Sequence, residues 1–207
     1  MNRRQSSGRR IALCGVLLAI FGLLPTCAPP FRVPVSLRLP PESPRGEAEA
    51  MDLVIRATVL ADEEAQLELF RANLIVAGLL PLYLEMVNRG DTAIELHRAR
   101  IEVWDERGER LAVRTPRQAL RRLFEYYEVT AYRIAARQEL ERAFADTAFV
   151  FTRALAPGET RRGMLFLALA GERGPRQPPE RLTLTVAALR RTGSSETFAL
   201  TLRIARQ

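Results

Sequence analysis

Short apolar segments separated by turn residues constrain the fold of this 207-residue chain most strongly. In residues 80–88, every second side chain is apolar, so that Leu82, Leu84 and Met86 share one face. This period of two is typical of a strand that is buried on one side. Similar segments recur from residue 53 to residue 204, with Gly, Pro and Asp between them. The pattern predicts a mainly β fold, an antiparallel sandwich of two sheets.

Two hairpins are predicted from their turns. Residues 105–108 are polar and end in Gly108, which suits a turn that needs a positive φ. We expect Leu111 and Val113 to continue the pairing after this turn. Residues 192–195 form a second polar turn, which is expected to join the last two strands of the chain.

Helical segments interrupt the strands. One begins at Asp62, a good N-capping residue followed by acidic side chains. A larger helical insertion covers about residues 115–147 and begins at Thr115-Pro116. Its apolar residues follow at spacings of three and four, and this register slips near Arg137, where we expect the helix to break. The stripe consists of Leu120, Leu123, Phe124, Tyr127, Ala131 and Ile134.

The insertion also carries the candidate partner-binding residues. Tyr126, Val129 and Tyr132 form a second stripe on the opposite side, beside Arg133. Tyr and Arg are enriched at the centres of protein interfaces. A helix that is apolar on two faces either presents one of them to a partner or is buried on both. In the second case the β-branched pair Val129-Thr130 would end the helix, and both stripes would belong to the core.

The strand region resembles the immunoglobulin-like domains of bacterial envelope lipoproteins. The resemblance rests on residues 87–91, residues 104–108 and the Pro-Gly-Glu turn within residues 155–159, followed by Gly163 and Phe166. It extends over about residues 80–190 and implies an immunoglobulin-like sandwich without implying an activity. The helical insertion departs from that pattern.

The N-terminal segment has the form of an export signal. A basic head that ends at Arg9-Arg10 precedes an unbroken apolar run of 14 residues, 11–24. A helix of this length measures about 21 Å, which is short of the roughly 30 Å of a bilayer core. We therefore expect residues 1–26 to be a signal peptide, with an uncleaved membrane anchor as the alternative.

The residues that follow resemble the lipobox of bacterial lipoproteins. In Leu23-Leu24-Pro25-Thr26-Cys27, the apolar residue three positions before the cysteine and the cysteine itself match the motif. The resemblance implies cleavage before Cys27, acylation of its thiol and membrane lipid as a partner. Because Cys14 lies in the leader, Cys27 would be the only cysteine of the mature chain. Ala28, in the next position, resembles the outer-membrane sorting signal of lipoproteins in some bacteria.

Seven prolines between Pro25 and Pro44 exclude a helix in this part of the chain. We expect residues 27–50 to form a Pro-rich tether, in which the roughly 20 residues up to Pro44 extend over about 60 Å at roughly 3.1 Å per residue. Apolar residues alternate with others over residues 31–39, so a docked edge strand there is the alternative. The sandwich domain would then comprise residues 51–207.

The charge pattern argues against nucleic acid as a partner. The formal net charge of +7 falls to +3 beyond residue 26, where 27 arginines stand against 24 acids. Those arginines are interspersed with acids, which is typical of a solvated surface rather than of a phosphate-binding stripe.

The sequence contains none of the motifs that we associate with catalysis. His97 is the one histidine, a Gly-x-Ser-x-Gly elbow is absent, and zinc would need several His or Cys ligands. We therefore expect no cofactor, no metal and no enzymatic activity. The expected function is that of an exported, lipid-anchored protein at the outer membrane, facing the periplasm, that binds or assembles with an envelope protein. The alternatives are an inner-membrane accessory subunit that keeps its leader, and a hydrolase with scattered carboxylates.

Overall fold

A computed structural model describes residues 31–32, 39–41, 43–129, 134–169 and 177–205. The three described helices are α2 (Glu63–Phe70), α3 (Pro116–Tyr126) and α4 (Ile134–Thr147). The strands are β1 (Arg45–Ala50), β2 (Leu53–Val59), β3 (Leu79–Asn88), β4 (Ile94–Glu95), β5 (Arg100–Asp105), β6 (Arg110–Leu111), β7 (Val113–Arg114), β8 (Thr160–Ala168), β9 (Arg181–Arg191) and β10 (Thr197–Ala205).

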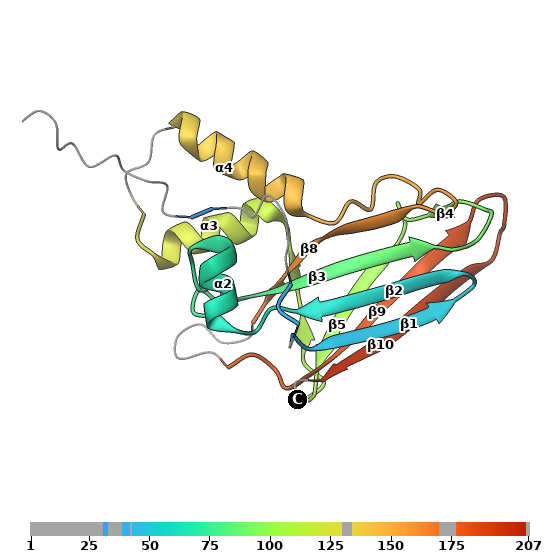
Figure 1. The fold of residues 1–207 in the computed structure, drawn as a ribbon, viewed down its shortest axis with the longest axis horizontal. Helices are drawn as coiled ribbons and strands as arrows, with labels where there is room; N and C mark the ends of the chain where they lie inside the picture. Colours follow the sequence, from blue (N-terminus) through green and yellow to red (C-terminus); the bar gives the residue numbers. More distant parts are fainter. Residues whose placement is uncertain (1–30, 33–38, 42, 130–133, 170–176, 206–207) are drawn as a thin grey trace, which may run out of the picture.

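The strands form two antiparallel sheets that pack face to face as an open sandwich (Figure 1). Sheet A has the order β1-β2-β3-β8-β7, and sheet B has the order β10-β9-β5-β6 with β4 paired to β9. The predicted fold class, a mainly β antiparallel sandwich with a helical insertion, is confirmed, and this open sandwich is consistent with an immunoglobulin-like fold. The helices of the insertion, α3 and α4, lie within the predicted limits of 115–147.

Alternation along the strands builds the first core, between the two sheets. In β3, Leu80, Leu82, Leu84 and Met86 are fully buried there, as the period of two predicts. Sheet B supplies the facing layer through β9 and β10, with the buried residues Leu182, Leu184, Val186, Leu200, Leu202 and Ile204.

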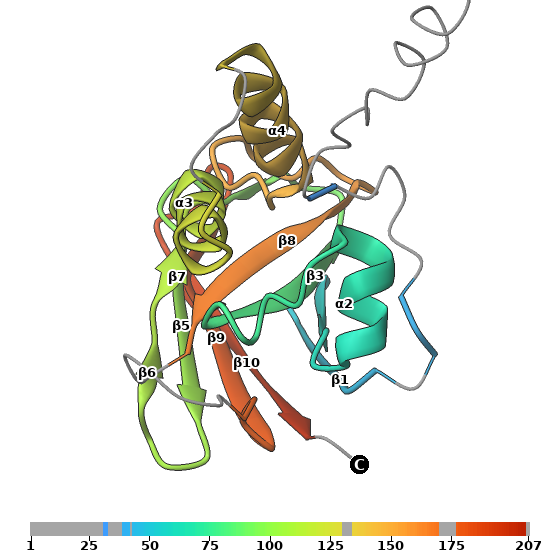
Figure 2. The same ribbon diagram turned by 90° about the vertical axis from the view of Figure 1, so that its left-hand side faces the viewer.

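A second core lies on the outer face of sheet A. Leu79 of β3 and Met164 and Phe166 of β8 point to this side, away from sheet B, and are also buried. The helices cover them at one end of the sheet, so that the molecule has three layers there (Figure 2). We call this end of the molecule, formed by α2, α3, α4 and residues 31–32, the helical end.

Strand β1 lies within the segment that the sequence assigned to the tether. Its sequence, Arg-Gly-Glu-Ala-Glu-Ala, has little β propensity, and no Gly or Asn marks its turn. The turn residues Met51 and Asp52 nevertheless both have positive φ. Arg191 holds this turn from sheet B, through bonds to the Met51 carbonyl (3.0 Å) and the Asp52 carboxylate (2.6 Å). The folded domain therefore begins well before the predicted boundary at residue 51.

Glycine lets β1 approach sheet B. A Cβ atom on Gly46 would lie 2.5 Å from the carbonyl oxygen of Arg203 in β10. The sandwich therefore closes tightly along the β1–β10 side.

The pairing predicted for Val113 is wrong. Leu111 pairs with Val103 in sheet B, as expected, but Val113 pairs with Leu167 in sheet A. The chain crosses between the sheets at Ala112, whose carbonyl accepts a bond from the backbone of Ala168 (2.8 Å). This crossing gives β8 a second neighbour and delivers the chain to the outer face, where α3 begins.

Asn88 joins two of the segments on which the resemblance to immunoglobulin-like domains rests, residues 87–91 and 155–159. Its side-chain amide donates to the carbonyls of Thr92 (2.9 Å), Leu155 (3.2 Å) and Ala156 (3.1 Å), and its backbone accepts a bond from Gly158 (2.9 Å). These bonds fix the loop end of the molecule, which we define as residues 51–52, 89–93, 154–159 and 192–196.

Arg161 is a buried residue that holds the segment before β8 in place. Only 7% of the residue is exposed, and its guanidinium donates to the carbonyls of Val150, Arg153 and Ala154 and to the Glu159 carboxylate. With its planar fork of donors, one side chain thus ties the segment before β8 to Glu159.

Replacing Asn88 by Asp should lower the free energy of unfolding by about 3 kcal/mol at neutral pH, because a carboxylate would then face three carbonyl oxygens. The matched control, Asp91→Asn, makes the reverse change in the exposed part of the same loop and should stay within about 0.5 kcal/mol of the wild type. Urea unfolding of both variants measures the difference, and equal midpoints would contradict this role of Asn88.

Candidate functional site

The helical end brings together segments that are far apart in the sequence. Helix α2 begins at Asp62, whose side chain accepts a bond from the backbone of Ala65 (2.7 Å), as the sequence predicts. Helix α3 begins with a capping box, in which Thr115 and Gln118 each bond to the other's backbone N–H. Both helices are therefore started by local sequence, while their positions are set by the second core.

Helix α3 ends earlier than predicted. Glu128 adopts a left-handed conformation (φ 51°), and the Val129 N–H bonds to the Phe124 carbonyl (3.0 Å), which are the features of a Schellman cap. Helix α4 then continues through Arg137 without interruption. The insertion is therefore divided into two helices, as a break predicts, but the break lies before Ile134 and not near Arg137.

Phe31 docks the N-terminal segment onto the helical end. Its side chain is 2% exposed, and its ring lies 5.7 Å from that of Phe124 and 5.4 Å from that of Tyr127, measured between centroids. Leu39 also packs against this second core. The segment assigned to the tether therefore contains docked residues. Residues 33–38, most of the predicted edge strand, lie outside the described part of the chain.

Arg32 caps the C-terminus of α2. Its backbone N–H donates to the carbonyl of Phe70 (2.9 Å), and its guanidinium donates to the carbonyls of Leu69 (3.3 Å) and Glu68. The last turn of α2 contains no basic residue of its own. Arg32 thus supplies, from a distant position in the sequence, the positive charge that the end of a helix favours.

Tyr127 links α3 to the loop after α2. Its hydroxyl accepts a bond from the Asn73 N–H (3.0 Å) and donates to the Asn73 carbonyl (3.2 Å). Burial raises the pKa of this phenol above its usual value, and the negative charge of nearby Glu63 raises it further. The same loop is held by Gln66, which is fully buried and accepts a bond from the Leu74 N–H (2.7 Å).

The candidate partner-binding residues differ in exposure, and two of them lie outside the described part of the chain. The side chain of Tyr126 is 47% exposed, and its ring packs edge-on against that of Tyr127. Val129 is half-buried against the second core. Tyr132 and Arg133 lie outside the described residues, as does the candidate lipid-attachment residue Cys27. The structure therefore describes one exposed member of the set, and its role in binding a partner stays a prediction.

A shallow groove of about 410 Å³ lies between the start of α3 and the middle of α4. Its lining mixes both signs of charge, with Arg117 and Arg142 beside Glu141. These side chains are largely solvated, so the groove is not a built binding site. The lining residues are Thr115, Pro116, Arg117, Gln138, Glu141, Arg142 and Ala145.

Carboxylates on sheet A are held by arginines in a row across the strands. Arg56 of β2 bonds to Glu47 of β1 (2.5 Å) and to Glu85 of β3 (2.9 Å), and Arg162 of β8 bonds to Glu85 (2.6 Å). Burial alone would raise the pKa of Glu85, but the hydrogen bonds from Arg162 and Arg56 outweigh it and the pKa is lowered. The pKa of Glu159 is lowered too, chiefly by the hydrogen bond from the Ala156 N–H. Both carboxylates therefore stay ionised at neutral pH.

The remaining candidates for chemistry are dispersed. His97 is exposed in the turn between β4 and β5. Within the described ranges, no group of three or more His, Cys, Asp or Glu side chains is arranged to hold a metal ion. In that same part of the chain, none of the helices has both the length and the apolar character needed to cross a membrane.

Phe31→Ala should lower the free energy of unfolding by about 3 kcal/mol, because it removes a buried aromatic side chain from the second core. The control, Val150→Ala, shortens a side chain that is 43% exposed and should change stability by less than about 0.5 kcal/mol. Urea unfolding compares the two. An unchanged midpoint for Phe31→Ala would show that residues 31–32 do not contribute to the folded domain.

Glu85→Gln should cost about 1 kcal/mol at pH 7, because two ion pairs at the surface of sheet A are lost. The pKa of Glu85 is lower in the folded than in the unfolded chain, so its stabilisation is complete above the unfolded value and is lost as the pH falls through the folded value. The difference between wild type and variant should therefore shrink below about pH 4. Glu196→Gln, in the exposed turn before β10, is the control. A difference that does not depend on pH would contradict the assignment.

Comparisons with known proteins give little information about the fold, which is defined by the strands described above. No family model and no curated protein matches the chain. Among solved structures, the chain is similar to the crystal structure of a DUF4426 family protein from Pseudomonas aeruginosa PAO1, at 11% identity and a TM-score of 0.29. The match covers 78% of this chain and 94% of that one. A TM-score this low does not establish a shared fold.

Proposed function

We propose that this chain is an exported, lipid-anchored protein of the bacterial cell envelope, with a role in binding or assembly rather than catalysis. In this proposal residues 1–26 are removed and Cys27 is acylated, as its resemblance to a lipobox implies. The observation that carries the proposal is the basic and apolar leader, which ends in a lipobox-like sequence at Cys27. Phe31, four positions after Cys27, is docked on the second core. Nearly the whole mature chain would then belong to the domain or to its anchor.

The apolar leader and the single cysteine support the anchor. A lone thiol in an exported chain has no intramolecular disulfide partner, and acylation gives it a role. Two or three acyl chains hold a protein stably on a bilayer, where one chain does not. By the residue after the cysteine, Ala28, we place the protein at the outer membrane, facing the periplasm.

The electrostatics support a non-catalytic role. A carboxylic acid that acts as a general acid at neutral pH needs a raised pKa. Glu85 and Glu159 instead have lowered pKa values and accept hydrogen bonds from arginines. Both carboxylates stabilise strand pairing or the loop end, so neither of these two residues favours the hydrolase alternative.

Cys27→Ser should abolish incorporation of labelled palmitate into the protein in cells, because the acceptor thiol is lost. Cys14→Ser is the matched control and should keep the label, since Cys14 is removed with the leader. Intact-mass measurement on the purified wild type should show an acylated chain that begins at Cys27. Label retained on the Cys27→Ser variant would contradict the anchor, and a chain that still begins at Met1 would favour the inner-membrane alternative.

A further inference from the structure

We infer that the helical end lies on the membrane that holds Cys27, with the side chains of Tyr126 and Leu67 in the lipid headgroup region. This inference rests on the proposed function, because it takes the acylated cysteine as the anchor point. It adds a defined orientation of the domain and a surface that contacts lipid.

The length of chain between the anchor and the domain sets the geometry. Phe31 is fixed against the end of α3 by its aromatic contacts, and Arg32 is bonded to the last turn of α2. Phe31 is four positions after Cys27, so even a fully extended chain between them spans only about 14 Å. The bilayer surface must therefore lie close to the helical end, and not the 60 Å away that a free tether would allow.

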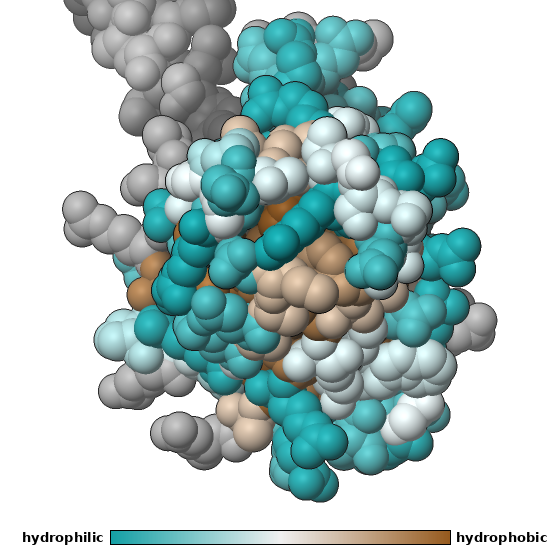
Figure 3. Space-filling view, turned by 90° about the vertical axis from the view of Figure 1, so that its right-hand side faces the viewer, coloured by the Kyte–Doolittle hydropathy of each residue, from teal (hydrophilic) through white to brown (hydrophobic). Residues whose placement is uncertain are grey.

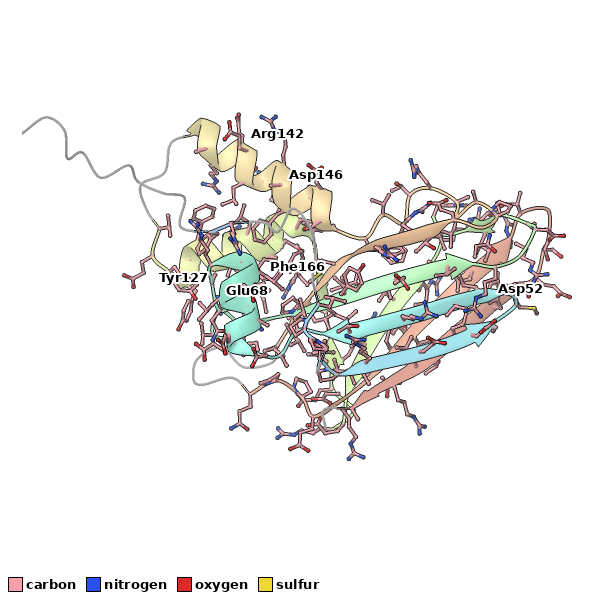
Figure 4. The ribbon with its side chains drawn as sticks, viewed as in Figure 1. Asp52, Glu68, Tyr127, Arg142, Asp146 and Phe166 are labelled. Carbon is pink, nitrogen blue, oxygen red and sulfur yellow. The ribbon has the colours of Figure 1, made fainter. Side chains whose placement is uncertain are left out.

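The helical end presents side chains that suit this environment. Tyr126 is 47% exposed and Tyr127 38%, and Leu67 on α2 is 46% exposed. Arg32 bonds to the Glu68 and Leu69 carbonyls in the last turn of α2, while its neighbour Phe31 packs on Tyr127. The last turn of α2, which begins with Leu67, therefore lies near the end of α3. Tyrosine rings concentrate where membrane and water meet, because one edge is apolar and the other is polar. Figure 4 shows Tyr127 and Glu68 together at this end.

Charge does not drive this contact. The exposed side chains around these apolar residues include Arg71, Glu63, Glu68 and Glu128, so both signs are present. Arg32 is already engaged with the carbonyls of α2. Contact should therefore be as good on neutral vesicles as on anionic ones, unlike that of a polybasic surface.

The loop end provides a matched apolar position out of reach of the membrane. Strand β3 runs from the helical end to the loop end, and its ten residues span about 33 Å. Asp52, next to Met51, lies at the opposite end from Tyr127 in Figure 4. Met51 is 55% exposed, which is as open to solvent as Tyr126 and Leu67.

Photocrosslinking from single positions tests the orientation. Benzoylphenylalanine replaces Tyr126, Leu67 or Met51 in the full mature protein, purified with its acyl chains and reconstituted into vesicles of radiolabelled phosphatidylcholine, with or without phosphatidylglycerol. All three positions are exposed, so the fold should tolerate the substitutions. We expect labelled lipid to be crosslinked at positions 126 and 67 but not at position 51. The result should be the same on both kinds of vesicle.

Two outcomes would overturn the orientation. One is lipid crosslinking at position 51 that equals that at position 126. The other is the absence of lipid crosslinking at position 126. This outcome includes the case in which position 126, tested in native membranes, crosslinks to a protein instead of to lipid.

Acylation of Cys27 is tested separately, by measuring the intact mass of the protein in the same sample. If the Cys27 thiol is free, the proposed function fails, and the orientation is then tested by coupling that thiol to a maleimide lipid before crosslinking.

Discussion

The structure depends on two strands that are apolar on both faces. In β3 and β8, Leu80 and Leu167 point into the sandwich, while Leu79 and Phe166 point outward and are just as buried. A two-layer sandwich leaves the outer face of each sheet to solvent, where apolar side chains of this size would cost about 2 kcal/mol each. The outer face of sheet A therefore requires a third layer. The loops that leave β2 and β7 supply it, as α2 and as the insertion of α3 and α4 (Figure 2).

The third layer is in turn held by residues from outside it. Phe31 fills the space beside α3, and Arg32 satisfies the carbonyls at the end of α2. Helices of eight and eleven residues are too short to be stable alone in water, so their order comes from such tertiary contacts. The segment that precedes the sandwich in sequence is consequently part of the structure that covers it.

Sequence periodicity was sufficient to predict a strand or helix wherever that element is buried on one side and exposed on the other. The alternation in β3, the hairpin turn at Gly108 and the caps at Asp62 and Thr115 all follow from local chemistry. Strand β1 escaped prediction because half-buried alanines form its inner face, and its turn is held by Arg191 rather than by its own residues. The contact of Arg191 with this turn leaves no pattern in the local sequence.

The same limit applies to the candidate site. The position of Tyr126 opposite the core stripe of α3 could be predicted, although its exposure stayed open. The docking of Phe31 depends on the rings of Phe124 and Tyr127, which are distant in the sequence. Proline-rich sequence around Phe31 favours an extended chain, which is equally compatible with a tether and with a docked segment. Only the three-dimensional arrangement distinguishes them, because burial of one aromatic ring outweighs the entropy of a few ordered residues.

The two ends of the molecule are suited to different tasks. The helical end is where the chain leaves the domain toward Cys27, and it combines apolar rings with charges of both signs. The loop end is rigid, since Asn88, Arg161 and Arg191 tie its loops together, and it shows apolar surface surrounded by polar residues (Figure 3). Loops held on a firm scaffold are the usual place for recognition. In the orientation that we infer, with the helical end on the membrane, the loop end would point away from the membrane.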